Sequence, residues 1–457
     1  MMRVFVGLGA VTLLLAACGG GTTAPASSAA APPSAPASKP AAPVAASSAA
    51  GKPVAPGASA KPAASGAAIA SGGATTFDGN LLVGAPVSLT GSLNNEGKLT
   101  QQGYDVWADV ANSKGGVSVG GKHYKVELKY YDDQSKQDQS ALITDKLISQ
   151  DKVQFLLSPY GTAGTFAASV ISEKAKIPML DSNGAANSIF QRGFKYIFGV
   201  LSPSTKYLTG VEDVWLAQNP KPTKLAVLAA NDAFSIEVAK AAADYGTQKG
   251  LQVVYNQSYP SDTKDLSSAL NQIKSSGADV LLGSGHLEDS LLLMKQVKSL
   301  GINFKGIGLS VGPSTPEFSN ALGKDAQYVF SGVQWVPDQK STGPVLGSAQ
   351  DYTAAFKKKF NTVPEYHSAD GAAAGLALQL AIEKAGTLDK NKVRDTLAGL
   401  SADTFYGHIQ FDSRGFNSDK PMLEIQLQGA GNKQVSVWPQ SSASGKVMWP
   451  TPNWNSR

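Results

Sequence analysis

Cysteine is almost absent from this sequence, because Cys18 is the only one among 457 residues. A single cysteine cannot form a disulfide within the chain, so the folded part must be held together by core burial alone. Long apolar runs are also missing. The run at 4–15 is shorter than the ~20 residues that a membrane-spanning helix needs, and no later run is apolar enough.

Acidic residues are absent from the first 77 positions. Four of the 40 basic residues lie there, which leaves 36 basic against 35 acidic residues in the remainder. The overall charge of +5 therefore belongs mainly to the N-terminal segment, and the rest of the chain is close to neutral. Nucleic-acid binding requires a positive stripe on a folded surface, so this distribution excludes that class of partner.

Residues 1–18 have the features of a bacterial export signal. Arg3 precedes the apolar run, which ends in Leu15-Ala16-Ala17-Cys18 followed by three glycines. This ending is similar to a lipobox, the site at which a cysteine is lipidated and the chain is cut before it. It predicts an extracytoplasmic protein anchored through Cys18 to the outer face of the cytoplasmic membrane, or to the outer membrane in a two-membrane cell. An ordinary secretory signal with an incidental cysteine is the alternative.

Residues 19–76 consist almost entirely of Ala, Pro, Ser, Gly and Thr. Such a composition cannot bury enough apolar surface to offset the entropy lost on ordering, so we predict a disordered tether. Its reach is about 40 Å by the scaling for flexible linkers. Three roles for this tether are compatible with its composition. It could give the domain the freedom to reach a partner, act as a spacer through a crowded cell surface, or carry attached glycans.

From residue 80 the chain alternates strand-like and helix-like segments, which is typical of parallel sheets covered by helices. We predict strands at 81–87, 124–131, 153–157, from 177, 224–230, 251–255, 278–282, 304–309, 408–411 and 423–427. We predict helices at 98–112, 139–149, 164–174, 236–248, 265–275, 288–300, 316–322, 350–360, 371–384 and 392–400. Because the pattern breaks near 201–204 and then restarts, we expect an α/β fold with two doubly wound lobes.

Several motifs in a fixed order over some 360 residues carry a resemblance to a known family. They are 84–91 (Gly-Ala-Pro-Val-Ser-Leu-Thr-Gly), Asn112 with 115–117, 130–133 (Tyr-Tyr-Asp-Asp), 157–161 (Leu-Ser-Pro-Tyr-Gly), 366–369 (Tyr-His-Ser-Ala) and 405–412. In these segments the chain resembles type I periplasmic binding proteins, in particular the branched-chain amino-acid-binding receptors of ABC importers.

The resemblance implies two parallel-sheet lobes joined by three crossovers, near Leu201, Gln334 and Asp403, that close like a hinge on a small molecule. The first lobe would comprise about 80–200 plus 335–402, and the second about 201–334 plus 403–439, with a C-terminal tail at 441–457. The implied partners are a small-molecule ligand and the permease subunits of the importer, with neither a cofactor nor catalysis. A ligand sensor of the same fold that serves a signalling partner is the alternative.

The resemblance also places ligand contacts on loops of both lobes, at the ends of strands and the starts of helices. The implied contacts are Thr90, Glu96, Tyr160, Gly161, Thr162, Ala163, Asn183, Gly184, Ala185, Asp232, Phe234, His286, Ser310 and Trp335. The hydroxyls and amides around Tyr160 precede a helix and suit a carboxylate, whereas Phe234, His286 and Trp335 would form apolar or stacking walls.

Two departures from the family pattern leave the ligand open. The amino-acid-binding members carry an acidic residue near position 310, where this chain has a neutral serine, and the hydroxyl expected near Ala185 is missing. Glu96, Asp232 or Glu288 could replace the missing charge. An amino acid or small amide and an aromatic or other organic carboxylate therefore stay as alternatives.

Three other motifs suggest different functions, and each is outweighed by its sequence context. Gly308-Leu309-Ser310-Val311-Gly312 spells the G-x-S-x-G of hydrolases, with His367 and His408 downstream, but prolines at 313 and 316 place a loop where a hydrolase turns into a helix. The glycine-rich segment 116–122 has P-loop spacing but precedes a strand. His286, Glu288 and Asp289 suit a helix start better than a metal site, so we predict no metal.

Overall fold

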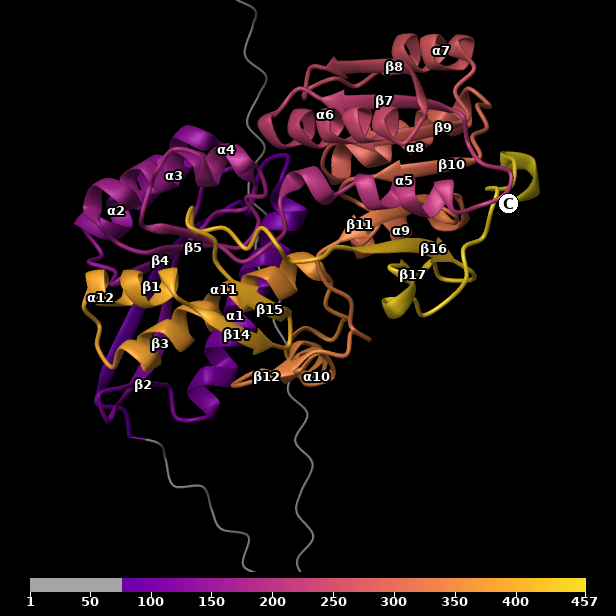
Figure 1. Cartoon of the computed structure of the whole chain (residues 1–457). Coiled ribbons are helices and arrows are strands. Elements are labelled where there is room, and N and C mark those ends of the chain that lie inside the picture. Colours follow the sequence, from indigo (N-terminus) through magenta and orange to yellow (C-terminus); the bar gives the residue numbers. More distant parts are fainter. Residues whose placement is uncertain (1–75) are drawn as a thin grey trace, which may run out of the picture. The chain divides into compact units, whose positions relative to one another are not determined.

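The computed structural model describes residues 76–457, which contain two sheets of mostly parallel strands (Figure 1). The export signal, Cys18 and the spacer up to residue 75 lie outside the described residues. Each sheet is flanked by helices, as the alternating sequence pattern predicts. The expectation of a two-lobed α/β fold is thereby confirmed.

The first sheet has six strands in the order β2-β3-β1-β4-β5-β6. Their bounds are β1 Gly79–Val87, β2 Val117–Val119, β3 Lys122–Asp132, β4 Phe155–Leu157, β5 Met179–Asp181 and β6 Ile197–Gly199. Only β2 pairs antiparallel, with β3, and the other neighbours are parallel. The last five residues of β1 are all buried, which is typical of a strand with helices on both faces of its sheet.

The helices of the first lobe come from two distant parts of the chain. They are α1 Asn94–Ser113, α2 Gln137–Ser149, α3 Thr162–Ala175 and α4 Asn187–Phe190, and then α10 Ala349–Phe360, α11 Tyr366–Ala385 and α12 Lys390–Ala398. Figure 1 shows α11, in orange, beside the indigo α1, and α12 packs against α11. The helices α1 and α11 approach closely, since a Cβ on Gly103 would lie 2.0 Å from the carbonyl of Ser368.

The second sheet has seven strands in the order β17-β16-β11-β10-β9-β7-β8. Their bounds are β7 Lys224–Ala230, β8 Gln252–Tyr259, β9 Val280–Ser284, β10 Gly306–Leu309, β11 Phe330–Val333, β16 Leu423–Gln428 and β17 Lys433–Trp438. The last two strands join antiparallel at one edge. The accompanying helices are α5 Thr209–Leu216, α6 Ala233–Gln248, α7 Ser267–Ser276, α8 Leu287–Ser299 and α9 Pro316–Leu322.

Three segments connect the two sheets, and buried polar groups hold them together. The side-chain oxygen of Gln334, after β11, accepts from the backbone N–H of Ser202 at 2.9 Å. The Nζ of Lys420 donates to the backbone carbonyl of Gln334 at 2.6 Å. Burial lowers the pKa of Lys420 to about 8. All three connections therefore meet at Gln334.

The third connection comes later than the sequence suggests. Instead of crossing near Asp403, the chain forms a hairpin of β14 Ser401–Thr404 and β15 Gly407–Gln410, and it reaches the second sheet only at β16. A smaller hairpin pairs β12 Thr342–Gly343 with β13 Gly347–Ser348. The C-terminal segment packs on the second lobe, where the indole N–H of Trp454 donates to the carbonyl of Ile302 at 2.7 Å.

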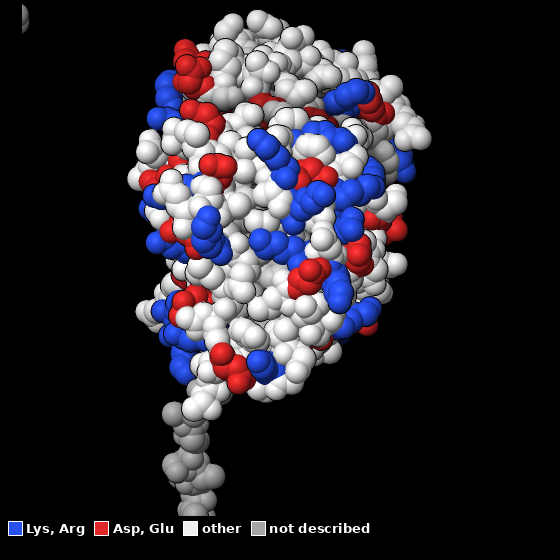
Figure 2. All heavy atoms as spheres, turned by 90° about the vertical axis from the view of Figure 1, so that its left-hand side faces the viewer, with Lys and Arg blue, Asp and Glu red and all other residues white. Residues whose placement is uncertain are grey.

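The face shown in Figure 2 carries basic and acidic side chains intermingled. This mixture fits the near-neutral charge of the chain after residue 77. Within the described residues no helix combines the length and the apolar character that crossing a membrane would require.

Candidate functional site

Two adjoining cavities lie between the lobes. The inner pocket has a volume of about 10 Å³, and its lining residues are Tyr160, Gly161, Thr162, Asn183, Tyr207, Phe234, His286, Val311, Tyr366 and His367. The outer cleft has a volume of about 520 Å³ and is lined from the first lobe by residues within 88–94, 133–140 and 160–164. The second lobe contributes Asp232 and residues within 261–264 and 286–295. Tyr160, Gly161, Thr162 and His286 line both cavities.

The turn from β4 into α3 presents backbone donors to both cavities. Gly161 precedes α3 with a φ of 81°, a left-handed conformation that favours glycine. The first turn of an α-helix has N–H groups without intrahelical partners, and the 14-residue α3 begins at Thr162. This end of α3 therefore suits an anionic group, as the sequence predicts.

Aromatic rings form the walls of the inner pocket. The ring of His286 lies 5.7 Å from that of Tyr160 and 5.6 Å from that of Phe234, centroid to centroid. Tyr207 meets Phe234 edge-on at 5.1 Å, and His367 meets Tyr160 edge-on at 5.4 Å. Burial raises the pKa of Tyr160 well above its usual value, so its hydroxyl stays protonated.

His367 is held in a fixed orientation by a buried carboxylate. Its Nδ1 lies 2.6 Å from Oε2 of Glu365, and the two side chains are 1% and 2% exposed. Because the carboxylate accepts a hydrogen bond from the N–H group at Nδ1, the other ring nitrogen of His367 is the one that remains for the pocket. Glu365 itself caps α11, since its Oε1 accepts from the N–H of Ser368 at 3.0 Å.

Direct bonds join the two lobes across the cleft. The Oε1 of Glu96, on α1, accepts from the backbone N–H of Leu287, on α8, at 3.0 Å. The hydroxyl of Tyr160 lies 3.1 Å from Nδ1 of His286. Both bonds need the lobes to be in contact, so this conformation is a closed one and its inner pocket is correspondingly small.

Asn183 reaches the inner pocket from the loop after β5, and a buried carboxylate shapes that loop. The Oδ1 of Asp181 accepts from the N–H groups of Asn183 at 3.2 Å and of Gly184 at 2.8 Å. Burial raises the pKa of Asp181 to about 7. The Asn183 amide in turn donates to the hydroxyl of Thr100 at 3.1 Å.

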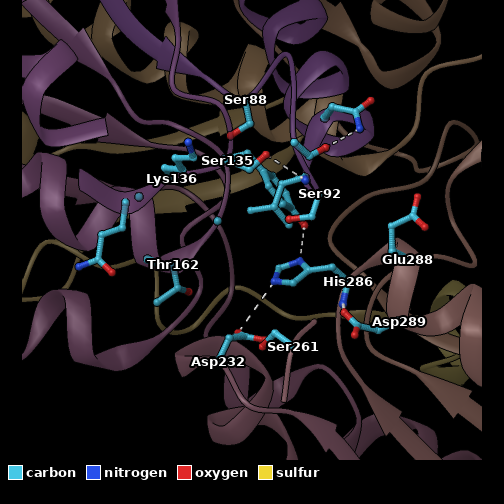
Figure 3. Close-up of a pocket in the computed structure, with 18 of the residues that line it drawn as sticks. Ser88, Ser92, Ser135, Lys136, Thr162, Asp232, Ser261, His286, Glu288 and Asp289 are labelled. Carbon is cyan, nitrogen blue, oxygen red and sulfur yellow. Dashed lines mark hydrogen bonds and ion pairs between the residues drawn. The ribbon is translucent and has the colours of Figure 1, made fainter. Parts of the chain in front are cut away.

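Asp232 and Asp289 lie at the starts of α6 and α8, on the second-lobe side of the outer cleft. The Oδ1 of Asp232 accepts from the N–H of Phe234 at 3.0 Å, at the start of α6. The same oxygen lies 3.9 Å from Nε2 of His286. Asp289 accepts from the N–H of His286 at 2.9 Å. Figure 3 shows the ring of His286 in the cleft, with Thr162 of the first lobe to its left and a dashed line joining it to Asp232 of the second lobe.

Six of the residues expected at the site line neither cavity. The hydroxyl of Thr90 donates to Asp132 at 2.6 Å, beside the outer cleft. Gly184 and Ala185 lie behind Asn183, with Ala185 only 1% exposed. Glu96 bonds across the cleft, as described above, without lining either cavity. Ala163, by contrast, lines the outer cleft.

Ser310 and Trp335, the other two, serve the structure in other ways. The hydroxyl of Ser310 accepts from the N–H of Gly285 at 3.0 Å and donates to its carbonyl at 2.9 Å, which ties the loop before His286 to β10. A serine bound to backbone in both directions is not an activated nucleophile. Trp335 is 1% exposed, and its indole N–H donates to the carbonyl of Phe405. It belongs to the core and not to a pocket wall.

Four residues that line the inner pocket are not among the contacts expected from the sequence, namely Tyr207, Val311, Tyr366 and His367. The segment 366–369 belongs to the motifs of the family resemblance, but the resemblance implies no ligand contact for Tyr366 or His367. A signal was present, since Glu365 stands one position before them as an N-cap residue. Among the described residues no group of three His, Cys, Asp or Glu side chains could hold a metal ion.

A cleft between two hinged α/β lobes, lined by aromatic rings and a helix N-terminus, defines a binding protein of the two-lobed kind. The family model described as "Periplasmic binding protein" matches residues 81–432, which is more than half of the chain. The chain belongs to this family, and it is therefore a binding protein and not an enzyme.

Individual relatives agree with this membership. The chain is 26% identical to "Leu/Ile/Val-binding protein homolog 7" of Brucella suis over 83% of this chain and 96% of that protein. The structure of the branched-chain amino acid transporter substrate binding protein LivJ of Streptococcus pneumoniae, in complex with isoleucine, superposes with a TM-score of 0.69 at 18% identity and covers 81% of this chain and 100% of that one. An ABC-transporter solute binding protein of R. palustris, in complex with 4-hydroxybenzoate, also gives 0.69 at 20% identity, covering 83% and 99%.

Proposed function

We propose that this protein is the extracytoplasmic receptor of an ABC importer and that it captures a small aromatic carboxylate by closing its two lobes. The chain would be anchored by a lipid on Cys18, with residues 19–76 as the tether. Family membership and the two solved relatives that carry ligands support the importer context.

The residues that line the inner pocket favour an aromatic carboxylate over an amino acid as the ligand. Six of its ten lining residues are Tyr, Phe or His, and none of the ten is acidic. An α-amino acid needs a carboxylate close to its ammonium group, because a buried charge without a partner is costly. An aromatic acid needs only ring walls and donors for its carboxylate, and the inner pocket supplies both.

In this proposal the carboxylate of the ligand lies at the start of α3. The N–H groups there and the hydroxyl of Thr162 would donate to it. The aromatic ring would lie between Tyr160, Phe234 and His286. The inner pocket is too small for a ring in this fully closed conformation. The ligand would therefore enter with the lobes apart, and the lobes would close on it less far than they do here.

A second candidate is an amino acid, and one observation favours it. The Oε2 of Glu96 is buried and has no hydrogen-bond partner among the described residues. An ammonium group beside Glu96 would satisfy that oxygen. The relative of S. pneumoniae is in complex with isoleucine, which is such a ligand.

A thermal-shift screen of the purified full chain separates the two candidates. The panel contains benzoate, 4-hydroxybenzoate, leucine, isoleucine and leucinamide. A ligand at 100 times its dissociation constant should stabilise the protein by about 2.7 kcal/mol. We expect stabilisation by the aromatic acids. Stabilisation by isoleucine alone would favour the amino acid, and no stabilisation by any member would contradict the receptor proposal.

The anchor and the partner are tested separately. Replacement of Cys18 by alanine should abolish incorporation of labelled palmitate and release the protein from the membrane fraction. Retention of the label would contradict the anchor. Neighbouring genes for a permease and an ATPase would support import, whereas a neighbouring kinase or chemoreceptor gene would support a sensor.

A further inference from the structure

Two polar atoms on the first-lobe wall of the inner pocket form no hydrogen bond within residues 76–457. They are the hydroxyl oxygen of Tyr366 and Nε2 of His367, on the first two residues of α11. The Tyr366 hydroxyl is buried without a partner, and the residue is 1% exposed. The ring of His367, also 1% exposed, bonds only through Nδ1, to the carboxylate of Glu365.

The neighbours of these two rings fix their orientation. The rings of Tyr366 and His367 stack with their centroids 3.9 Å apart and an angle of 29° between their planes. Tyr160 meets the ring of His367 edge-on, and Glu365 holds its Nδ1. Because neither ring can turn without losing these contacts, the two polar atoms stay available to a bound molecule.

Tyr366 and His367 belong to the first lobe, as does Thr162 at the start of α3. All three residues line the same inner pocket, so one small molecule can reach them together. Hinge motion moves the lobes as rigid bodies, so it leaves the three residues in place relative to one another. Phe234 and His286 of the second lobe would then close on a ligand that the first lobe already holds.

A hydroxyl group is the ligand substituent that suits both polar atoms. The hydroxyl of Tyr366 can donate and accept, whereas Nε2 of His367 accepts when the ring is neutral and donates when it is charged. A ligand hydroxyl donates or accepts as needed, so it satisfies Nε2 in either form. A carboxylate can only accept, and a methyl group can do neither.

A ligand without such a group would leave both atoms buried and unpaired. An unpaired polar group in a dry site is costly, and the closed conformation without ligand already carries this cost. A ligand hydroxyl would remove it. A site built to bond a hydroxyl therefore discriminates against the analogue that lacks it more strongly than an apolar pocket discriminates by size.

We infer that Tyr366 and His367 bind a hydroxyl group on the ring of the ligand, so that the preferred ligand is a hydroxylated aromatic acid. This inference rests on the proposed function, because it takes the carboxylate of the ligand to lie at the start of α3. The start of α3 would then recognise the acid, and the first turn of α11 would select among aromatic acids.

Titration calorimetry of the purified full chain tests the inference by comparing a hydroxyl with a methyl group at the same ring position. The probes are benzoate, 3- and 4-hydroxybenzoate, and 3- and 4-methylbenzoate. A methyl group is similar in size to a hydroxyl but forms no hydrogen bond. We expect the tighter-binding hydroxybenzoate to bind about ten-fold more tightly than benzoate and than its own methyl counterpart.

Two variants test the assignment to these residues. Tyr366→Phe removes a hydroxyl that bonds to nothing in the described part of the chain, so the variant should fold as wild type does. His367→Asn removes Nε2 and keeps a side-chain N–H that can donate to Glu365. Each variant should lower the ratio of hydroxybenzoate to methylbenzoate affinity by about five-fold. The matched control Tyr352→Phe, at a buried tyrosine that lines neither cavity, should keep the wild-type ratio.

The outcomes separate this inference from the proposed function. If benzoate and the methylbenzoates bind as tightly as the hydroxybenzoates, the hydroxyl site is refuted while the proposed function stands. A hydroxyl preference that stays unchanged in Tyr366→Phe or in His367→Asn refutes the assignment to that residue. If none of the aromatic acids binds, both the inference and the aromatic-carboxylate function are contradicted.

Discussion

The carboxylate of Glu96 accepts a hydrogen bond from the backbone N–H of Leu287 at 3.0 Å, and this bond joins α1 of the first lobe to α8 of the second. The protein thereby supplies its own anion to the N-terminus of α8. A ligand carboxylate is then left with the N-terminus of α3, at Thr162. The same bond gives the closed conformation a contact that does not depend on the ligand.

The first prediction is that Glu96→Ala opens the ligand-free protein. A hydrogen bond to a charged group contributes about 1.5–3 kcal/mol, so its loss should raise the open population by about ten-fold or more. Pulsed electron paramagnetic resonance between spin labels at Leu142 and Lys240, in a Cys18→Ser background, measures the distance between lobes. The control Glu127→Ala removes a carboxylate that faces solvent in the first lobe. An unchanged distance distribution for Glu96→Ala would show that this bond does not hold the lobes together.

The second prediction concerns Trp335, which the resemblance places at the ligand and the structure places in the core. Trp335→Ala should destabilise the protein by about 3–5 kcal/mol in urea unfolding, because it leaves a cavity beside Tyr352 and Phe405. Trp335→Phe should cost less and should bind the ligand with wild-type affinity. If a stable Trp335→Phe protein bound the ligand more weakly than wild type, Trp335 would contribute to ligand binding, which would contradict this prediction.

The third prediction is that Ser310→Ala lowers the stability of the protein and changes no enzymatic activity. Removing the two bonds between the Ser310 hydroxyl and Gly285 should cost about 1–3 kcal/mol in urea unfolding. Hydrolysis of a nitrophenyl ester should stay at the background rate in both proteins. An esterase activity of the wild type that disappears in Ser310→Ala would contradict the binding-only function.

The fourth prediction concerns pH. Both carboxylate oxygens of Glu212 are buried without a hydrogen-bond partner among the described residues, and burial raises its pKa to about 9. The folded state therefore keeps the proton where the unfolded state has released it. It follows that the contribution of Glu212 to the free energy of unfolding falls between about pH 5 and pH 9, by at most about 1.4 kcal/mol per pH unit.

Glu212→Gln should remove this dependence. The difference in free energy of unfolding between Glu212→Gln and wild type should shift in favour of the variant as pH rises from 5 to 9. Urea unfolding at four pH values measures it, and Glu127→Gln is the control with a solvated carboxylate. A difference that stays constant over this range would mean that Glu212 titrates normally in the folded protein.

The sequence predicted elements well where apolar runs or helix signals are clear. The strand Lys224–Ala230 and the helix Pro316–Leu322, with Thr315 as its cap and proline at its start, have the predicted bounds. The helix α11 begins at Tyr366, five residues before the predicted start, because Glu365 caps it. The first turn of α11 places Tyr366 and His367 in the site. A predicted helix that begins only at residue 371 leaves these two residues out of the helix and therefore out of the expected site.

The site was harder to predict because a resemblance locates loops but not side-chain directions. Tyr160, Phe234 and His286 do face the inner pocket, whereas Trp335 turns to Phe405 in the core. The side chain of Thr90 points to Asp132, because the carboxylate of Asp132 accepts a hydrogen bond from the Thr90 hydroxyl.

Titration calorimetry with 4-hydroxybenzoate and isoleucine, on wild type and on Phe234→Leu, tests the central claim most directly. The account predicts that wild type binds one molecule of 4-hydroxybenzoate. It also predicts that Phe234→Leu binds it about ten-fold more weakly, because an aromatic wall of the inner pocket is lost. Binding of isoleucine in place of 4-hydroxybenzoate, or equal affinities in the two proteins, would contradict it.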